Sequence, residues 1–130
     1  MILLDTHVVV WLLSDPARLS NAARRAIREA RQNNEGLAIS DISLLEMTIL
    51  KRKNRIQMTT SLELFLQEIE SRFVILPISG RACVRSLELP APYPNDPADR
   101  MIAATALVEG LALVTADRAM RRSAGLRTIW

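Results

Sequence analysis

Cysteine and histidine are nearly absent from this chain, which has one of each among its 130 residues. A single cysteine, Cys83, cannot form an internal disulfide, so the sequence predicts a cytoplasmic protein. No apolar run approaches the ~20 residues that a membrane-spanning helix requires, so we expect no membrane partner. The N-terminus has neither the basic lead-in nor the small-residue cleavage site of a signal peptide. Internal repeats, linkers and low-complexity tracts are also missing, which predicts a single domain over residues 1–130.

Hydrophobic residues make up 49% of the chain, which favours a compact fold with a sizeable core and excludes a disordered chain. The formal net charge is +3, and arginine is strongly favoured over lysine. Such a surface suits a polyanionic partner. The ordinary explanation, which charge alone slightly favours, is a basic helix face that is simply solvated, formed by Arg24, Arg25, Arg28 and Arg31.

Short apolar runs alternate with segments of helical periodicity along the chain. We expect strands at residues 1–5, 37–39, 73–77, 111–115 and, near a sheet edge, 126–130. Helices are expected at about residues 8–13, 20–32, 41–53, from 60 onward, 80–87, 97–109 and 117–122. This alternation predicts a doubly wound, three-layer α/β/α sandwich with a mostly parallel sheet of about five strands.

Some boundaries and buried positions carry their own signals. Thr60 and Glu63 have the spacing of a capping box at the start of a helix. The proline-rich passage 90–97 is expected to be irregular. Cys83 is expected to be a small buried apolar residue.

Two aspartates follow predicted strands. Asp5 ends the first strand, and Asp117 comes two residues after the strand at 111–115. In an open parallel sheet, ligands bind beyond the carboxyl ends of the strands. A cap for the next short helix explains Asp117 about equally well, whereas a buried strand end has little structural use for an acid at Asp5.

Glu46 lies on an apolar helix face. At about 100° per residue, it falls beside Ile42, Ile49 and Leu50. An unpaired carboxylate there would lose several kcal/mol of hydration, so it should have a cationic partner. The ordinary alternative is a glutamate at the edge of the apolar stripe that reaches solvent or an arginine. We favour the functional explanation.

Asp99 begins an apolar stripe that continues at +3, +4 and +7, with Ile102, Ala103 and Ala106. A carboxylate in a first helical turn also suits the helix dipole, but the apolar neighbours favour a site. Asp96 precedes Pro97 in the pattern of an N-cap followed by proline at the first helical position. Asp96 is therefore more easily explained as a cap than as a ligand.

These acids are expected to converge. Like charges raise one another's pKa and repel, so such a cluster persists only with a bound cation or shared protons. Carboxylate ligands without a set of cysteines or histidines select Mg²⁺ or Mn²⁺ over Zn²⁺. Mg²⁺ accepts phosphate oxygens and can activate a water as a nucleophile. Acids, a hard dication and a basic surface together point to phosphodiester hydrolysis.

Four parts of the chain carry these acids in a fixed order: Met1–His7, Glu46 after residues 40–43, Asp96–Ala106 and Leu113–Asp117. In this order they resemble the motifs of the PIN-domain ribonucleases, and among those the VapC toxins of bacterial toxin–antitoxin modules. The resemblance spans nearly the whole chain and is most specific at Asp96–Ala106. It implies a compact α/β/α sandwich whose acids bind Mg²⁺ or Mn²⁺ and cleave RNA.

By position, the resemblance implies that the catalytic and metal-binding acids are Asp5, Glu46, Asp99 and Asp117. Asp96 matches a further acid that either assists them or only caps its helix. Thr6 and Thr115 match polar positions that orient a carboxylate or water, and Arg100 matches an arginine that contacts phosphate or a carboxylate. The resemblance also implies a homodimer and a cognate antitoxin whose tail blocks the site.

Two other classes of protein stay open. Another Mg²⁺-dependent phosphotransfer enzyme or phosphatase is one, although aspartyl phosphatases have a second aspartate where this chain has His7. A non-catalytic binding module, whose acids only stabilise the fold, is the other. His7 itself is most simply structural, and Trp11 and Trp130 either pack in the core or anchor a partner.

Overall fold

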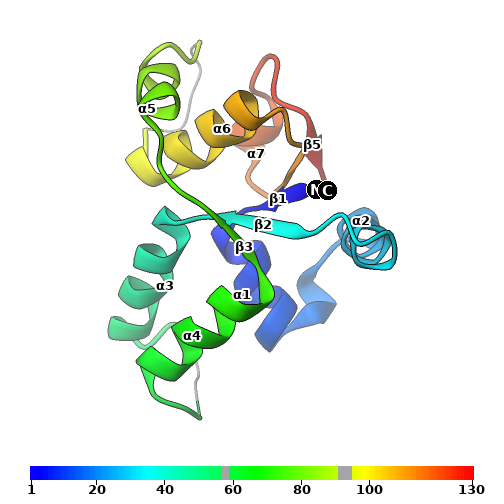
Figure 1. The fold of residues 1–130 in the computed structure, drawn as a ribbon, viewed down its shortest axis with the longest axis vertical. Coiled ribbons are helices and arrows are strands. Elements are labelled where there is room, and N and C mark those ends of the chain that lie inside the picture. The colour runs from blue at the N-terminus through cyan, green and yellow to red at the C-terminus, as the bar shows by residue number, and fades with distance from the viewer. Residues whose placement is uncertain (57–58, 91–94) are drawn as a thin grey trace.

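The computed structural model describes residues 1–56, 59–90 and 95–130, and a five-stranded sheet lies at its centre (Figure 1). The strands are β1 (Ile2–Leu4), β2 (Leu37–Ser40), β3 (Val74–Leu76), β4 (Leu113–Val114) and β5 (Thr128–Ile129). Their spatial order is β3-β2-β1-β4-β5. Every pairing is parallel, where the sequence predicted a mostly parallel sheet. The order reverses between β1 and β4, and sheets of this kind bind ligands beyond the carboxyl ends of the strands at such a reversal.

Both faces of the sheet are buried. The register pairs Leu3 with Leu113 and Leu4 with Val114. Because successive side chains point to opposite faces, Leu4 and Val114 belong to one core cluster and Leu3 and Leu113 to the other. All four side chains have no exposed surface, so each face needs its own layer of helices.

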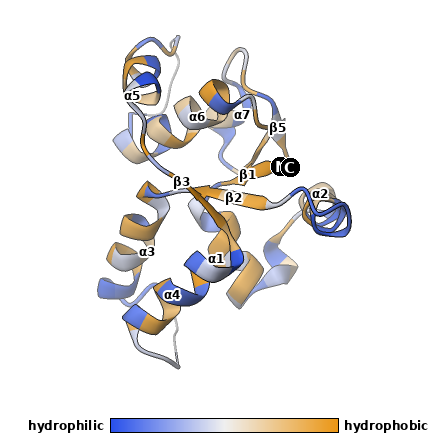
Figure 2. Cartoon of the chain, viewed as in Figure 1, coloured by the Kyte–Doolittle hydropathy of each residue, from blue (hydrophilic) through white to orange (hydrophobic). Residues whose placement is uncertain are grey.

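One layer of helices contains α1 (Thr6–Ser14), α2 (Asn21–Gln32), α3 (Ile42–Arg52) and α4 (Leu62–Arg72), with a 3₁₀ turn, η1 (Pro16–Arg18), between α1 and α2 (Figure 1). Their apolar residues form one cluster with Leu4 and Val114, and its helical members include Val8, Ile27, Met47 and Ile69. Figure 2 shows β1, β2 and β3 as hydrophobic and most of α2 as hydrophilic. The solvated arginine face expected on this helix is thus present, because Ala23, Ile27 and Ala30 are its buried residues.

The other layer contains α5 (Gly80–Leu87), α6 (Pro97–Glu109) and the short α7 (Arg118–Arg121). Ile102, Ala103 and Ala106 of α6 and Met120 of α7 pack with Leu3 in the second cluster. The predicted three-layer α/β/α sandwich is therefore confirmed, with β5 at an edge of the sheet. Within the described ranges, no helix has both the length and the apolar character to cross a membrane.

The start of α4 differs from the predicted capping box. Ser61, not Thr60, is the N-cap, and its hydroxyl accepts a hydrogen bond from the Leu64 amide at 3.2 Å. Glu63 therefore falls one position too early to close a box. Two adjacent hydroxyl residues offer the same capping chemistry, so spacing alone does not select the correct one.

Cys83 is exposed, which contradicts the prediction that it is buried. The reason is that α5 is an outer helix that contacts α6 and buries only Ala82. Cys83 lies about 100° further round the helix. A small apolar side chain is buried only if its helix face packs against the core, and the prediction did not consider the position of α5 in the fold.

Candidate active site

Asp5 lies at the carboxyl end of β1 and is held by two donors. Its Oδ1 accepts a hydrogen bond from the Thr6 amide at 2.8 Å, which makes Asp5 the N-cap of α1. Its Oδ2 accepts one from the Thr115 hydroxyl at 2.6 Å. The residue is only 2% exposed, so these donors replace the water that the carboxylate loses on burial.

Thr115 joins two parts of the chain at the end of β4. Its hydroxyl donates to Asp5 and accepts a hydrogen bond from the Asp117 amide at 3.0 Å. Thr115 has no exposed surface. Its single proton is thus directed at the carboxylate, and Asp5 is fixed relative to the turn that carries Asp117.

Thr6 performs a similar task toward α3. Its hydroxyl donates to Oε1 of Glu46 at 2.5 Å and is 2.9 Å from the hydroxyl of Ser43. Because Thr6 uses its proton on Glu46, Ser43 is the donor in the second bond. The sequence reasoning missed Ser43, whose position three residues before Glu46 on the same helix was the available signal.

Glu46 and Asp99 both have raised pKa values. Burial is the main cause for Glu46; the Thr6 hydrogen bond lowers its pKa, and the charges of Asp5 and Asp96 raise it. Burial, followed by repulsion from Asp5, Asp96, Glu46 and Asp117, raises the pKa of Asp99 to about 7. The pocket therefore carries more negative charge than its own side chains stabilise.

Asp96 caps α6 and also belongs to the acidic cluster. Its Oδ1 accepts hydrogen bonds from the amides of Ala98 at 2.8 Å and Asp99 at 3.1 Å. The cap predicted from Asp96–Pro97 is confirmed. In addition, one carboxylate oxygen from each of Glu46, Asp96 and Asp99 lies within 4.8 Å of the other two. Sequence reasoning treated capping and clustering as alternatives at this residue.

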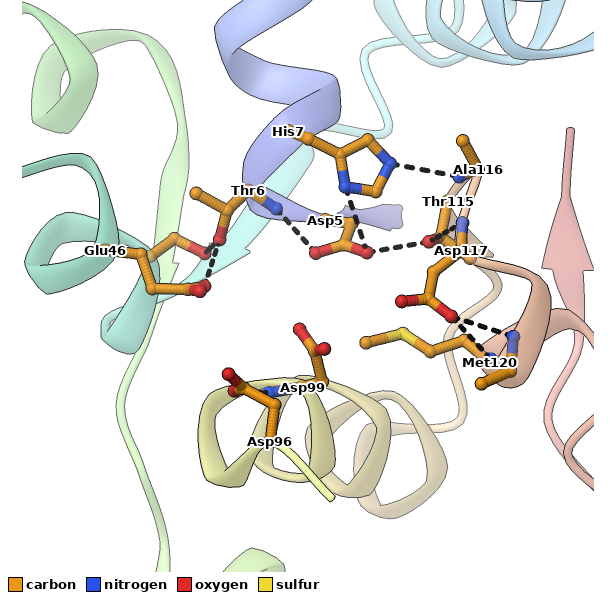
Figure 3. Close-up of polar contacts among 12 residues, drawn as sticks. Asp5, Thr6, His7, Glu46, Asp96, Asp99, Thr115, Ala116, Asp117 and Met120 are labelled. Carbon is orange, nitrogen blue, oxygen red and sulfur yellow. Dashed lines mark hydrogen bonds and ion pairs between the residues drawn. The ribbon is translucent and has the colours of Figure 1, made fainter. Parts of the chain in front are cut away.

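Asp117 is the N-cap of α7, through hydrogen bonds from the amides of Ala119 at 2.8 Å and Met120 at 3.1 Å. It is half-buried, and its charge acts on Asp99. Figure 3 shows the carboxylates of Asp5, Glu46, Asp96, Asp99 and Asp117 around one open space. The structure thus brings all four acids favoured from sequence together and adds Asp96.

His7 has a structural position beside this cluster. Its Nε2 accepts a hydrogen bond from the Ala116 amide at 3.0 Å, and its Nδ1 lies 3.5 Å from Oδ2 of Asp5. The ring centroid is 4.8 Å from that of Trp11 and 6.5 Å from that of Trp130. Both tryptophans are half-buried against the core, which supports the packing explanation for them.

Four of the acids line a pocket of about 580 Å³. Asp5, Glu46, Asp96 and Asp99 contribute to its acidic wall, and the rest of its lining includes Leu45, Ile49, Leu50, Lys53 and Arg55. Leu45 and Ile49 are exposed, at 55% and 41%. Arg100 follows Asp99 on α6 and is half-buried, outside the described residues that line this pocket. The pocket has room for a hard cation beside its carboxylates and for part of a larger ligand against its apolar and basic lining.

Comparison with known proteins agrees with this architecture. The PIN domain family matches residues 2–126. The chain is 37% identical to Ribonuclease VapC22 of Mycobacterium tuberculosis over 131 aligned positions, which cover 99% of this chain and 98% of that protein.

Two solved structures share the fold over nearly their whole length. One is DNA-bound VapBC from Salmonella typhimurium, with a TM-score of 0.72, 25% identity, and coverage of 98% of this chain and 97% of that one. The other is a toxin–antitoxin complex from Klebsiella pneumoniae, with a TM-score of 0.63, 26% identity, and coverage of 97% and 95%. The phosphatase and non-catalytic alternatives are therefore set aside, and the chain belongs to the PIN-domain family of nucleases, within its VapC ribonuclease group.

Proposed function

We propose that this protein is a Mg²⁺- or Mn²⁺-dependent endoribonuclease toxin of a toxin–antitoxin pair. The observation that carries the proposal is the meeting of Glu46, Asp96 and Asp99, with one oxygen of each within 4.8 Å of the others. It is supported by the similarity to a named VapC ribonuclease along the whole chain.

The donor set suits a hard divalent cation. All candidate ligands are carboxylates. Mg²⁺ and Mn²⁺ prefer such oxygen ligands. We assign Asp5, Glu46, Asp96 and Asp99 as the residues that would hold the cation, with Asp117 beside them. A cation held there would polarise a phosphate oxygen and activate a water for attack on phosphorus.

The remaining polar residues organise these acids. Thr115 fixes the direction of the Asp5 carboxylate, and Thr6 fixes that of Glu46. Asp99 has a pKa near 7, so at neutral pH it readily exchanges a proton. Loss of that proton would accompany cation binding. We keep Arg100 as a candidate contact to phosphate or to a neighbouring carboxylate.

The test is cleavage of a labelled RNA by purified protein with Mg²⁺, with Mn²⁺ and with EDTA. We expect cleavage only with a metal, and a loss of at least about 100-fold in Asp5→Asn and Asp99→Asn. Asp15→Asn is the matched control, because Asp15 is an exposed aspartate beyond the end of α1. Equal cleavage by all four proteins, or cleavage in EDTA, would show that the activity does not belong to this pocket.

We also propose a cognate antitoxin as partner and a homodimeric state. The Klebsiella pneumoniae structure is a toxin–antitoxin complex, and in our chain Leu45 and Ile49 expose apolar surface inside the acidic pocket. Val84 and Leu87 of α5 are also strongly exposed, at 58% and 81%, and offer a surface for a second copy. Titration of the antitoxin against RNA cleavage and light scattering of the toxin alone test the two parts separately.

A further inference from the structure

A second, basic recess lies next to the acidic pocket. It has a volume of about 440 Å³ and is lined by Arg118, Arg121 and Arg122 around α7 and by Thr128 and Trp130 at β5. Figure 1 shows α7 and β5 as neighbours. Three guanidinium groups therefore share one hollow.

The arginines of this recess form no ion pair within the described part of the chain. Arg118, Arg121 and Arg122 are all exposed. By contrast, Arg72 pairs with Glu68 at 2.6 Å. Arg121 and Arg122 lie at the end of α7, where a basic residue interacts favourably with the helix dipole, but that effect is worth only about 0.3–1 kcal/mol. It does not explain why three arginines line one recess.

The recess adjoins the acids. Arg118 follows Asp117 directly in the chain. Trp130, which lines the recess, has its ring 6.5 Å from the ring of His7, which lines the acidic pocket beside Asp5. A single-stranded RNA that leaves the acidic pocket past His7 would therefore meet the arginines of the recess next.

We propose that Arg118, Arg121 and Arg122 bind backbone phosphates of the single-stranded RNA next to the bond that is cut. This inference rests on the proposed ribonuclease function. Guanidinium groups match phosphate in charge and in geometry, and a basic groove bordered by an aromatic residue is a common surface for single-stranded nucleic acid. RNA is favoured over an acidic peptide because Trp130, which lines the recess, offers a ring on which a base can stack.

The arginines of α2 provide a matched contrast. Arg25, Arg28 and Arg31 are also exposed and also have no described acidic partner, but α2 covers the opposite face of the sheet. Removing three charges from either helix changes the net charge equally. A difference between the two variants therefore reports position rather than overall charge.

The experiment measures binding of a fluorescent single-stranded RNA in EDTA, where cleavage does not interfere, over about 50–200 mM salt. We compare the wild type with Arg118→Gln/Arg121→Gln/Arg122→Gln and with Arg25→Gln/Arg28→Gln/Arg31→Gln. The α7 variant should bind at least about 10-fold more weakly, with a salt slope smaller by about 2, since each phosphate contact on a single strand contributes about 0.7. The α2 variant should keep the wild-type salt slope. A variant with lysine in place of arginine at the three α7 positions should keep most of that slope.

Equal binding by the α7 variant and the wild type, or equal losses in the α7 and α2 variants, would overturn the inference. Thermal melting of each variant checks that the fold is retained. Cleavage in Mg²⁺ separates this inference from the proposed function. An α7 variant with a KM raised about 10-fold and a nearly unchanged kcat supports both. A wild type that binds RNA through α7 but cleaves nothing refutes only the ribonuclease function, whereas cleavage with an unchanged KM refutes only the role of α7.

Discussion

Asp5 and Asp99 are aspartates of the same pocket, but their negative charges are stabilised to different extents by the surrounding residues. The two oxygens of Asp5 accept hydrogen bonds from Thr6 and Thr115. No described residue donates a hydrogen bond to the carboxylate of Asp99, which faces burial and four other acids. The carboxylate of Asp5 is thus oriented by its hydrogen-bond donors. The negative charge of Asp99 depends more on a bound cation for its stabilisation.

Replacing Asp99 with asparagine should therefore stabilise the metal-free protein at neutral pH. The ordinary pKa of 3.8 rises to about 7 in the folded protein, so between these values the folded state holds a proton that the unfolded state has lost. The contribution of this proton on Asp99 to the free energy of unfolding is complete below about pH 4. It is lost as the pH rises through about 7. Because the side chain is half-exposed, we expect a gain of about 1–2 kcal/mol for Asp99→Asn at pH 8 and almost none at pH 4.

Thermal melting in EDTA across this pH range measures the effect, with Asp15→Asn as the control for a change of charge outside the pocket. A gain for Asp99→Asn that is independent of pH, or a loss at pH 8, would contradict the account of repulsion between the acids.

Thr115→Val should damage both stability and activity. The change removes the proton donated to Asp5 and the oxygen that accepts from the Asp117 amide, and both lie in a buried region. We expect a cost of about 1–3 kcal/mol and a loss of about 10- to 100-fold in cleavage, as for residues that orient metal ligands.

Thr105→Val is the matched control for Thr115→Val. Thr105 is also buried, but its hydroxyl donates only to the Met101 carbonyl within α6. Chemical denaturation and initial cleavage rates compare the two variants. Equal effects of both substitutions would show that the hydroxyl of Thr115 has no special role at Asp5.

At the scale of the elements, two helices begin at the acidic pocket and a third begins beside it. Asp5 caps α1, Asp96 caps α6 and Asp117 caps α7, and in each case Oδ1 accepts from the helix amides. The positive ends of three helix dipoles thus face the carboxylates and offset part of their repulsion. Capping uses one oxygen of each aspartate, so a cap and a cation ligand are compatible roles for one residue.

Two neighbouring hydroxyl residues, Thr60 and Ser61, stand at the start of α4, and we predict that only Ser61 stabilises the helix as its cap. Ser61→Ala removes the acceptor for the Leu64 amide and should cost about 1 kcal/mol. Thr60→Ala should change the free energy of unfolding by less than about 0.5 kcal/mol, because Thr60 is an exposed residue outside the helix. Urea denaturation of both variants measures the difference, and a larger cost at Thr60 would mean that α4 starts one residue earlier in solution.

At the scale of the whole molecule, the features of the fold and site that could be predicted from the sequence are those determined by local periodicity and by the geometry of a parallel sheet. The alternation of strands and helices predicted the sandwich, and the strand ends at Asp5 and Asp117 predicted where the acids gather. Asp96 was underrated because its cap explained it fully. The recess at Arg118 was not foreseen, since only folding brings β5 beside α7. Cys83 was placed in the core because its own sequence neighbourhood does not reveal that α5 lies outside.

Cation binding should stabilise the whole fold. If the acids bind Mg²⁺ or Mn²⁺ only when they are brought together, a concentration about 100 times the Kd adds about 2.7 kcal/mol. We expect a higher melting temperature for the wild type with either ion and a much smaller shift for Asp99→Asn. Melting curves recorded against ion concentration measure the shift. Equal shifts in both proteins would mean that the ions act elsewhere on the surface.

The hydrogen bond from Thr115 to Asp5 connects residues that are 110 positions apart. Since β1 has β4 as its neighbour, Asp5 meets its hydroxyl partner only after the segment that carries Thr115 has been synthesised. A nascent polypeptide that stops before Thr115 therefore lacks the finished carboxylate arrangement. Translation must pass this position before the pocket can take its final form.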